Sequence, residues 1–175
     1  MTESETFFNG RWLTLKRRGR WEYVERTNPA GAVIVVAVTD QDEVLFVEQY
    51  RVPIESKTIE MPAGLVGDLD EHAHEGVIET AHRELFEEAG YRAASIEFLA
   101  AGPSSAGMST EVIAFVRARG LTRVGDGGGD HTEDIVVHHV PRTECHEWLA
   151  QKGREGYSLD PKLYAGLYFL AREAT

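Results

Sequence analysis

The 175-residue sequence has one cysteine, Cys145, and no uninterrupted apolar run of the length that a membrane helix requires. A single cysteine excludes an intrachain disulfide framework, and a membrane helix needs roughly 18 consecutive apolar residues. The N-terminal segment MTESETFF is acidic and lacks the basic region and apolar run of a secretory signal. We therefore expect a cytoplasmic protein without a membrane partner.

Basic residues are also few: 18 lysines and arginines stand against 29 aspartates and glutamates, which gives a net charge of −11. A broad nucleic-acid surface requires clustered basic side chains that contact phosphates, so we expect no nucleic-acid partner. Apolar residues make up 42% of the chain, and its length is sufficient for one well-filled core. The expected organisation is a single domain over residues 1–175.

The first 28 residues favour a β meander. The segments RWLTLKR and RWEYVER, in the stretch that begins at Phe7, are rich in β-forming residues and are separated by a glycine-containing turn. Residues 29–175 are expected to form the core of the fold. Within them, Ala32–Val38 is a nearly continuous apolar run, which is typical of a strand buried on both faces in the middle of a sheet.

The remaining patterns predict an α/β domain in which a mixed sheet is covered by helices on both faces. Strands are expected over Val44–Gln49, Ser95–Ala101, Glu111–Arg119 and Ile135–Pro141, and helices over Arg142–Lys152 and Pro161–Glu173. The glycine-rich segment Asp126–His131 is expected to be a loop, and its glycines would give the backbone conformational freedom.

The most informative stretch is RELFEEAGY, Arg83–Tyr91, in an acidic segment that begins at Glu60. In a helix, Glu84, Glu87 and Glu88 share one face, next to an apolar stripe. Neighbouring carboxylates repel by about 1 kcal/mol or more per pair, so the arrangement is unfavourable unless a cation bridges them. Oxygen ligands without a nearby cysteine favour Mg²⁺ or Mn²⁺ over zinc. The alternative is an ordinary acidic helix with a solvated face.

These residues resemble a Nudix box. The family pattern has a glycine, five residues, a glutamate, seven residues, and then Arg-Glu-apolar-X-Glu-Glu-X-Gly-apolar. Glu75 and Arg83–Tyr91 fit this pattern, whereas its glycine would fall at Leu69. The glycine in a family-like context is Gly64, further upstream, so we interpret Asp68–Ala73 as holding a short insertion.

The resemblance implies a Nudix α/β/α sandwich with a mixed central sheet, and a metal-dependent hydrolase. Mg²⁺ is the expected ion, and Mn²⁺ is the alternative. The side chains of Glu84 and Glu88 and the main-chain carbonyl of Ala63 are expected to hold the metal, with Glu87 sharing a second ion. Glu87 and Glu88 are therefore also candidate catalytic residues.

Flanking motifs narrow the resemblance to the ADP-ribose pyrophosphatase branch, whose members hydrolyse ADP-sugars and related nucleoside diphosphate sugars. The motifs are WEYVERT, EQYR and EMPAG. Members of this branch recruit a glutamate from a loop after the sheet as base, and Glu133 stands in the matching place. His131 is the second candidate, because an imidazole accepts a proton near neutral pH. Arg83 is expected to pair with a box carboxylate such as Glu75, and an exposed ion pair within the helix is the alternative.

Five residues are candidates for substrate binding. Arg51 resembles the family arginine that contacts the diphosphate. A guanidinium is suited to this task because it can donate two parallel hydrogen bonds to phosphate oxygens. Arg26 is the second candidate. Trp12 and Trp21 resemble two aromatic residues that sandwich the adenine, one from each subunit, so we expect a homodimer. Alternatively, the two tryptophans pack in the core or in an interface and do not contact the base. Glu111 either reaches the site or begins a strand.

Three functional hypotheses follow. The first is hydrolysis of ADP-ribose, or of a related nucleoside diphosphate sugar, to a nucleoside monophosphate and a sugar phosphate. In the second, the protein is a Nudix hydrolase that cleaves another diphosphate, such as GDP-mannose, a dinucleotide or an oxidised nucleotide. The third is a Nudix module that senses ADP-ribose without cutting it, and it predicts damaged box glutamates, whereas Glu84, Glu87 and Glu88 are intact. A plain interaction protein would leave the carboxylate cluster unexplained.

Overall fold

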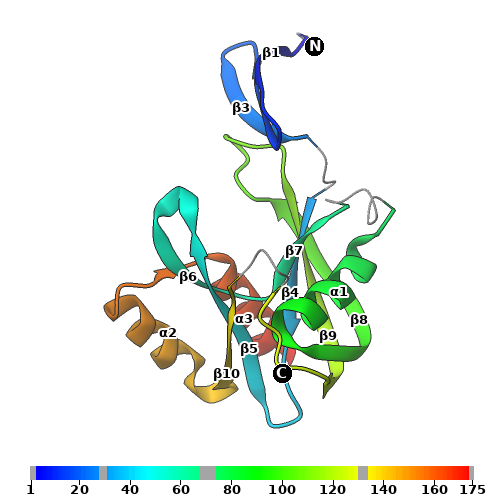
Figure 1. Cartoon of the computed structure of the whole chain (residues 1–175), viewed down its shortest axis with the longest axis vertical. Coiled ribbons are helices and arrows are strands. Elements are labelled where there is room, and N and C mark those ends of the chain that lie inside the picture. Colours follow the sequence, from blue (N-terminus) through cyan, green and yellow to red (C-terminus); the bar gives the residue numbers. More distant parts are fainter. Residues whose placement is uncertain (1–2, 28–30, 68–73, 130–133, 174–175) are drawn as a thin grey trace.

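The computed structural model describes residues 3–27, 31–67, 74–129 and 134–173. Its strands form three sheets, two of which contain both parallel and antiparallel pairs (Figure 1). This arrangement confirms the predicted α/β class with mixed sheets and an N-terminal meander. The single central sheet that we expected is, however, divided into two.

The N-terminal sheet consists of β1 (Glu5–Asn9), β2 (Leu13–Arg18) and β3 (Trp21–Arg26). Its strands are antiparallel, and it lies at one end of the molecule, apart from the other sheets (Figure 1). Val24 connects it to the core, because its N–H donates to the Met108 carbonyl at 2.8 Å and its carbonyl accepts from the Thr110 N–H at 3.2 Å. Much of the apolar surface of this sheet therefore remains exposed.

The other strands form two four-stranded sheets. The first has the order β7 (Ala63–Val66), β4 (Gly31–Ala37), β9 (Val112–Arg123) and β8 (Tyr91–Pro103). The second has the order β10 (Val136–Pro141), β5 (Glu43–Arg51), β6 (Ser56–Glu60) and β11 (Ser158–Leu159). Strand β4 runs parallel to β9, and β11 runs parallel to β6.

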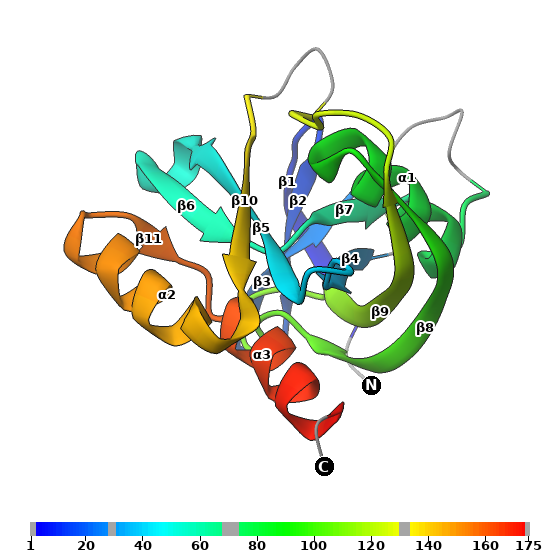
Figure 2. The ribbon, with the colours of Figure 1, turned by 90° about the horizontal axis from the view of Figure 1, so that it is seen from below.

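Strand β4 is buried on both faces, as its apolar sequence predicts. Val33 and Val35 pack in one core together with α1 (Val77–Ala89). Ile34 and Val36 pack in a second core with α2 (Cys145–Arg154) and α3 (Lys162–Glu173). Figure 2 shows α1 on one side of the molecule and α2 and α3 on the other. Burial of each such side chain contributes about 1.5–3 kcal/mol, so β4 joins the two helical layers firmly.

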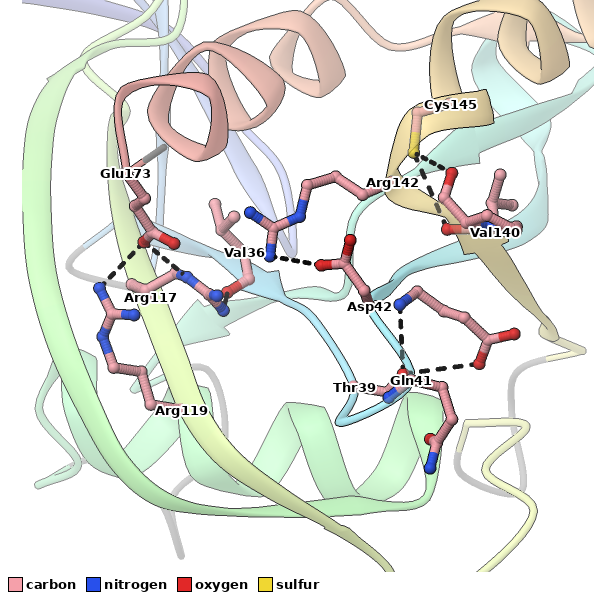
Figure 3. A network of polar contacts seen from close by, with 12 residues as sticks. Val36, Thr39, Gln41, Asp42, Arg117, Arg119, Val140, Arg142, Cys145 and Glu173 are labelled. Atoms are coloured by element: carbon pink, nitrogen blue, oxygen red, sulfur yellow. Dashed lines mark hydrogen bonds and ion pairs between the residues drawn. The ribbon is translucent and has the colours of Figure 1, made fainter. Parts of the chain in front are cut away.

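The C-terminal end of α3 is tied to the sheet by arginines of β9 (Figure 3). Arg117 is buried, and its Nε donates to Glu173 Oε1 at 2.8 Å, while its Nη1 donates to the carbonyls of Val36 and Ala118. Arg119 donates to the same Glu173 oxygen at 2.9 Å. Burial by itself raises the pKa of Glu173, but the arginines outweigh it and lower the pKa. These ion pairs hold the C-terminal end of α3 against β9.

Cys145, at the start of α2, is a packing residue. Its Sγ is buried and donates to the Pro141 carbonyl at 3.5 Å (Figure 3). Burial raises the pKa of this thiol to about 11. The thiol therefore stays protonated at neutral pH and is not a nucleophile in the folded protein.

Some elements differ from those predicted. Strand β8 begins directly after α1, four residues before the predicted start at Ser95, because it pairs with β9 over its whole length. Arg142–Glu144 form a 3₁₀ turn before α2, where the sequence predicts α-helix. No helix within the described ranges combines the length and apolarity that a membrane span requires.

Candidate active site

Two acidic residues of α1, Glu84 and Glu88, lie on its buried side. The helix ends at Gly90, whose φ of 74° lies in the left-handed region that favours glycine. Leu85 packs into the core, and Glu84 and Glu88 lie beside this apolar stripe with only 8% and 4% of their surface exposed. Because buried carboxylates are costly unless they are paired or bind a cation, this face of α1 is a candidate site.

The start of β7 contacts both carboxylates. The Ala63 N–H donates to Glu88 Oε2 at 2.9 Å. A Cβ on Gly64 would lie 1.9 Å from Glu84 Oε1, so Glu84 occupies the space that a side chain at this position would fill. The structure thus brings together Ala63, Glu84 and Glu88, the three residues expected to hold a metal. Their role as ligands stays a prediction.

Arg83 lies among carboxylates of the same motif. Its Nε donates to Glu75 Oε2 at 3.1 Å, and its Nη1 lies 2.9 Å from oxygens of both Glu84 and Glu87. Burial disfavours the guanidinium charge, but the surrounding carboxylates outweigh this effect and raise the pKa of Arg83 above its ordinary value. The expected pair with Glu75 is present, and Arg83 therefore links the segment before α1 to the helix.

Residues 124–129, which we call the glycine clamp, bind the C-terminal end of α1. The Gly128 N–H donates to the Glu88 carbonyl at 2.9 Å, and the Gly129 N–H donates to the Glu87 carbonyl at 3.0 Å. These bonds satisfy carbonyls that the end of a helix leaves without a partner. The conformational freedom that we expected for this loop stays a prediction, and residues 124–129 hydrogen-bond to the turn that carries Glu87 and Glu88.

Replacing Gly127 by alanine should destabilise the protein and weaken metal binding. Gly127 has a φ of +71°, and a Cβ there would lie 2.3 Å from the Glu88 carbonyl oxygen. A left-handed backbone costs a non-glycine residue about 1–2 kcal/mol, and the clash adds to it, so the free energy of unfolding should fall by about 2 kcal/mol or more. Urea unfolding and Mn²⁺ titration measure both effects.

The matched control is Gly125→Ala, because no atom lies within 4 Å of a Cβ built on this glycine. We expect this variant to unfold within about 0.5 kcal/mol of the wild type. Equal stability and Mn²⁺ affinity of the two variants would contradict the role that we give to the glycine clamp.

A pocket of about 690 Å³ lies where the two four-stranded sheets meet. One side of it is lined by Glu84 and Glu88 of α1 and by Gly64 of β7, which is a strand of the first sheet. Arg51 and Glu60 line it from β5 and β6 of the second sheet. The acidic face of α1 is therefore one wall of a cavity that a small molecule can enter.

Both arginines predicted to bind substrate line this pocket, and each pairs with a carboxylate. Arg51 donates from Nε and Nη2 to Glu60 at 2.7 and 2.8 Å, and Arg26 donates from Nε to Glu111 at 2.6 Å. Burial by itself raises the pKa of Glu60, but the fork of Arg51 and the Thr58 hydroxyl outweigh it and lower the pKa. Glu60 therefore stays ionised and holds the Arg51 guanidinium in place.

Two further pocket residues, Asp160 and Lys162, were not predicted from the sequence. They lie at the end of β11 and the start of α3, and the parallel pairing of β11 with β6 brings them to the site. Asp160 followed by Pro161 is a usual start of a helix, so the local sequence indicates capping rather than binding. Only the pairing of strands distant in sequence would have revealed these residues.

The remaining candidates lie elsewhere. Trp12 and Trp21 are 58% and 57% exposed on the N-terminal sheet and do not line the pocket of their own chain. The Arg11 guanidinium lies over the Trp12 ring, 4.5 Å from its centroid. Glu133 and His131, the two candidate bases, lie outside the described residues.

The carboxylates of Glu84 and Glu88 form the acidic wall of the pocket, and their oxygen donors fit a magnesium ion. Among the described residues, no three His, Cys, Asp or Glu side chains form a ready-made cage. Mg²⁺ does not require one, because it keeps several waters and takes one or two carboxylates together with substrate phosphates. Glu84 and Glu88 supply two carboxylates, and the described lining residues include no cysteine or histidine that would favour zinc.

A family model described as NUDIX domain matches residues 28–154. The methanol dehydrogenase activator of Bacillus methanolicus is 31% identical over 157 residues, which cover 86% of this chain and 82% of that protein. An ADP-ribose pyrophosphatase of Bacillus subtilis is 39% identical over 83 residues, which cover 47% of this chain and 42% of that protein.

The fold has solved counterparts. A protein described as an ADP compounds hydrolase has a crystal structure that matches with a TM-score of 0.69 and 24% identity, over 98% of this chain and 90% of the other. At this identity, the match shows a shared fold. Since the NUDIX model covers most of the chain, the chain belongs to the Nudix hydrolase family.

Proposed function

We propose that this protein hydrolyses the diphosphate bond of ADP-ribose, or of a related nucleoside diphosphate sugar, and releases a nucleoside monophosphate and a sugar phosphate. The observation that carries the proposal is the pocket in which buried Glu84 and Glu88 share a cavity with Arg51. The ADP-ribose pyrophosphatase activity named for the B. subtilis relative supports this substrate class. So do the flanking motifs around Trp21, Arg51 and Glu60.

The charge of the pocket supports a metal requirement. Its described lining contains three basic and five acidic side chains, so it is negative before any ligand enters. A diphosphate adds further negative charge and would be repelled unless divalent cations enter with it. We propose Mg²⁺ or Mn²⁺ at Glu84, Glu88 and the Ala63 carbonyl, with Glu87 at a second ion. When bound, such an ion would neutralise phosphate charge and would act as a Lewis acid toward water and the diphosphate.

The side chains around this centre have separate tasks in the proposal. Arg51, held by Glu60, donates to diphosphate oxygens, and Arg26 assists it from its pair with Glu111. Arg83 keeps the box carboxylates in position through its ion pairs. We propose Glu133 as the base that accepts a proton from water, and His131 is the second candidate for this role.

The test is an assay of purified protein against ADP-ribose, GDP-mannose, a dinucleotide and an oxidised nucleotide, with Mg²⁺ and with a chelator. We expect Mg²⁺-dependent cleavage, fastest with ADP-ribose or another nucleoside diphosphate sugar. Fastest cleavage of the oxidised nucleotide or the dinucleotide would favour our second hypothesis. Tight binding of ADP-ribose without cleavage of any compound would favour the non-catalytic sensor.

We also propose a homodimer, in which residues 1–28 form the dimer arm of a single domain whose core is residues 29–175. Phe8, Trp12 and Trp21 expose large apolar surfaces on the N-terminal sheet, and such patches mark interaction surfaces. Pairing of two arms would bring Trp12 and Trp21 toward the partner's pocket, where an indole can stack on a purine.

Light scattering at micromolar concentration should give twice the mass of the chain. Phe8→Glu should yield monomers, because a charge in an apolar interface is unfavourable. Phe98→Glu is the matched control, since Phe98 is also exposed but lies on β8, in a different sheet from the arm. A wild-type protein of monomeric mass would remove the proposed dimer.

A further inference from the structure

The first residue of α3 lies in the pocket. Lys162 lines it from the side of β5, β6 and β11, whereas Glu84 and Glu88 line it from the side of α1. Figure 2 shows β6 and β11 on one side of the molecule and α1 on the other. The positive charge of Lys162 therefore belongs to the wall that carries Arg51, not to the acidic wall.

Asp160 fixes the position of Lys162. One carboxylate oxygen of Asp160 accepts the Lys162 backbone N–H at 2.8 Å, and the other accepts a hydrogen bond from its Nζ. The Asp160 backbone is itself held, because its N–H donates to the Ile59 carbonyl at 3.1 Å and its carbonyl accepts from Leu163. The lysine is thus attached to β6 through a short and well-bonded segment.

The three basic residues of the pocket share one arrangement. In each ion pair the carboxylate is the more buried partner. The exposed fractions of the basic and acidic side chains are 45% and 9% for Arg51–Glu60, 36% and 19% for Arg26–Glu111, and 34% and 15% for Lys162–Asp160. The carboxylates therefore lie deeper in the pocket wall than the cations. A ligand that enters the pocket contacts the cations first.

We propose that Lys162 is a third anion-binding residue of this site, which contacts the substrate diphosphate from the wall opposite Glu84 and Glu88. That the ligand is a diphosphate rests on the proposed function. The position of the Lys162 ammonium in the pocket does not depend on that function. An ammonium held in this way acts as a point charge with rotatable donors, which complements the planar fork of Arg51. Asp160 is then a positioning residue for Lys162.

The test is calorimetric binding of inorganic pyrophosphate with Mg²⁺ to the wild type and to Lys162→Met. Loss of a charge-assisted hydrogen bond should raise the dissociation constant about tenfold or more. Lys162→Arg should restore much of the affinity. With ADP-ribose as substrate, Lys162→Met should raise KM by a similar factor and change kcat much less, because the residue binds and does not react.

Lys57→Met is the matched control. Lys57 lies on β6 and donates to the buried Glu48 at 2.7 Å, but it does not line the pocket. We expect this variant to bind pyrophosphate as the wild type does. Wild-type affinity in Lys162→Met, or an equal loss in both variants, would overturn the proposal. If the wild type cleaves none of the tested nucleotides, the proposed function fails, and the pyrophosphate comparison still decides the role of Lys162.

Discussion

Glu88→Gln should lose about 10³-fold in kcat while the fold stays intact. Glu88 is buried on α1, lines the pocket and accepts a hydrogen bond from the Ala63 N–H. An amide oxygen can still accept this bond, but it lacks the charge that holds a cation. Loss of several kcal/mol of charge stabilisation corresponds to this factor. Steady-state kinetics with ADP-ribose over a range of Mg²⁺ concentrations would measure it.

The same substitution should stabilise the protein in the absence of metal. Glu84 and Glu88 repel each other, and removal of one charge should raise the free energy of unfolding by about 1 kcal/mol when no cation is bound. This corresponds to a rise in Tm of about 2–4 °C for a chain of this size. Glu79→Gln, an exposed residue on the first turn of the same helix, is the matched control and should keep full activity. Full activity of Glu88→Gln with Mg²⁺ would contradict the assignment of the metal site.

Gly64→Ala should reduce kcat about 10²-fold with little loss of stability. The new Cβ would lie 1.9 Å from Oε1 and 2.3 Å from Cγ of Glu84, so this side chain must leave its place. Because a glutamate side chain has several rotatable bonds, we expect it to move to another rotamer at a cost of about 1 kcal/mol. The displaced carboxylate would no longer lie beside Glu88, and Mn²⁺ should therefore bind more weakly.

Gly153→Ala controls for the change of residue type. A Cβ at this position of α2 meets only the Leu159 side chain at 3.5 Å, which is an ordinary contact. Alanine also has a higher helix propensity than glycine, so this variant should be fully active and equally or more stable. Unchanged Mn²⁺ affinity in Gly64→Ala would contradict the view that this glycine makes room for Glu84.

The acidic wall of the site could be predicted from the sequence, because it depends on local spacing. Glu84 and Glu88 are four residues apart beside an apolar stripe, and this pattern alone fixes which face of α1 they share. Strand β4 could be predicted for a similar reason, since a continuous apolar run is favourable only where both faces are buried. In both cases the information lies within a few residues.

On the opposite wall, Arg51 was predicted from its resemblance to a family motif, whereas its pairing with Glu60 and the presence of Lys162 could not be predicted, because both depend on pairing between separate strands. The register of β5 with β6 places Arg51 beside Glu60, and the parallel pairing of β11 with β6 brings Lys162 to the pocket. Residues near Lys162 carry only the pattern of a capped helix. The hydrogen bonds of the glycine clamp could not be predicted either, since glycines with a positive φ are compatible with a free loop and with a tightly bonded one alike.

The proposed hydrolysis takes place in the pocket between the two sheets, and product analysis of ADP-ribose incubated with Mg²⁺ and wild-type protein tests it most directly. Mass spectrometry should detect AMP and ribose 5-phosphate in equal amounts, with neither product formed by Glu88→Gln or in the presence of a chelator. Failure of folded protein that binds Mn²⁺ to cleave either ADP-ribose or the related nucleoside diphosphate sugars would contradict the proposed reaction. So would equal product formation by the wild type and Glu88→Gln.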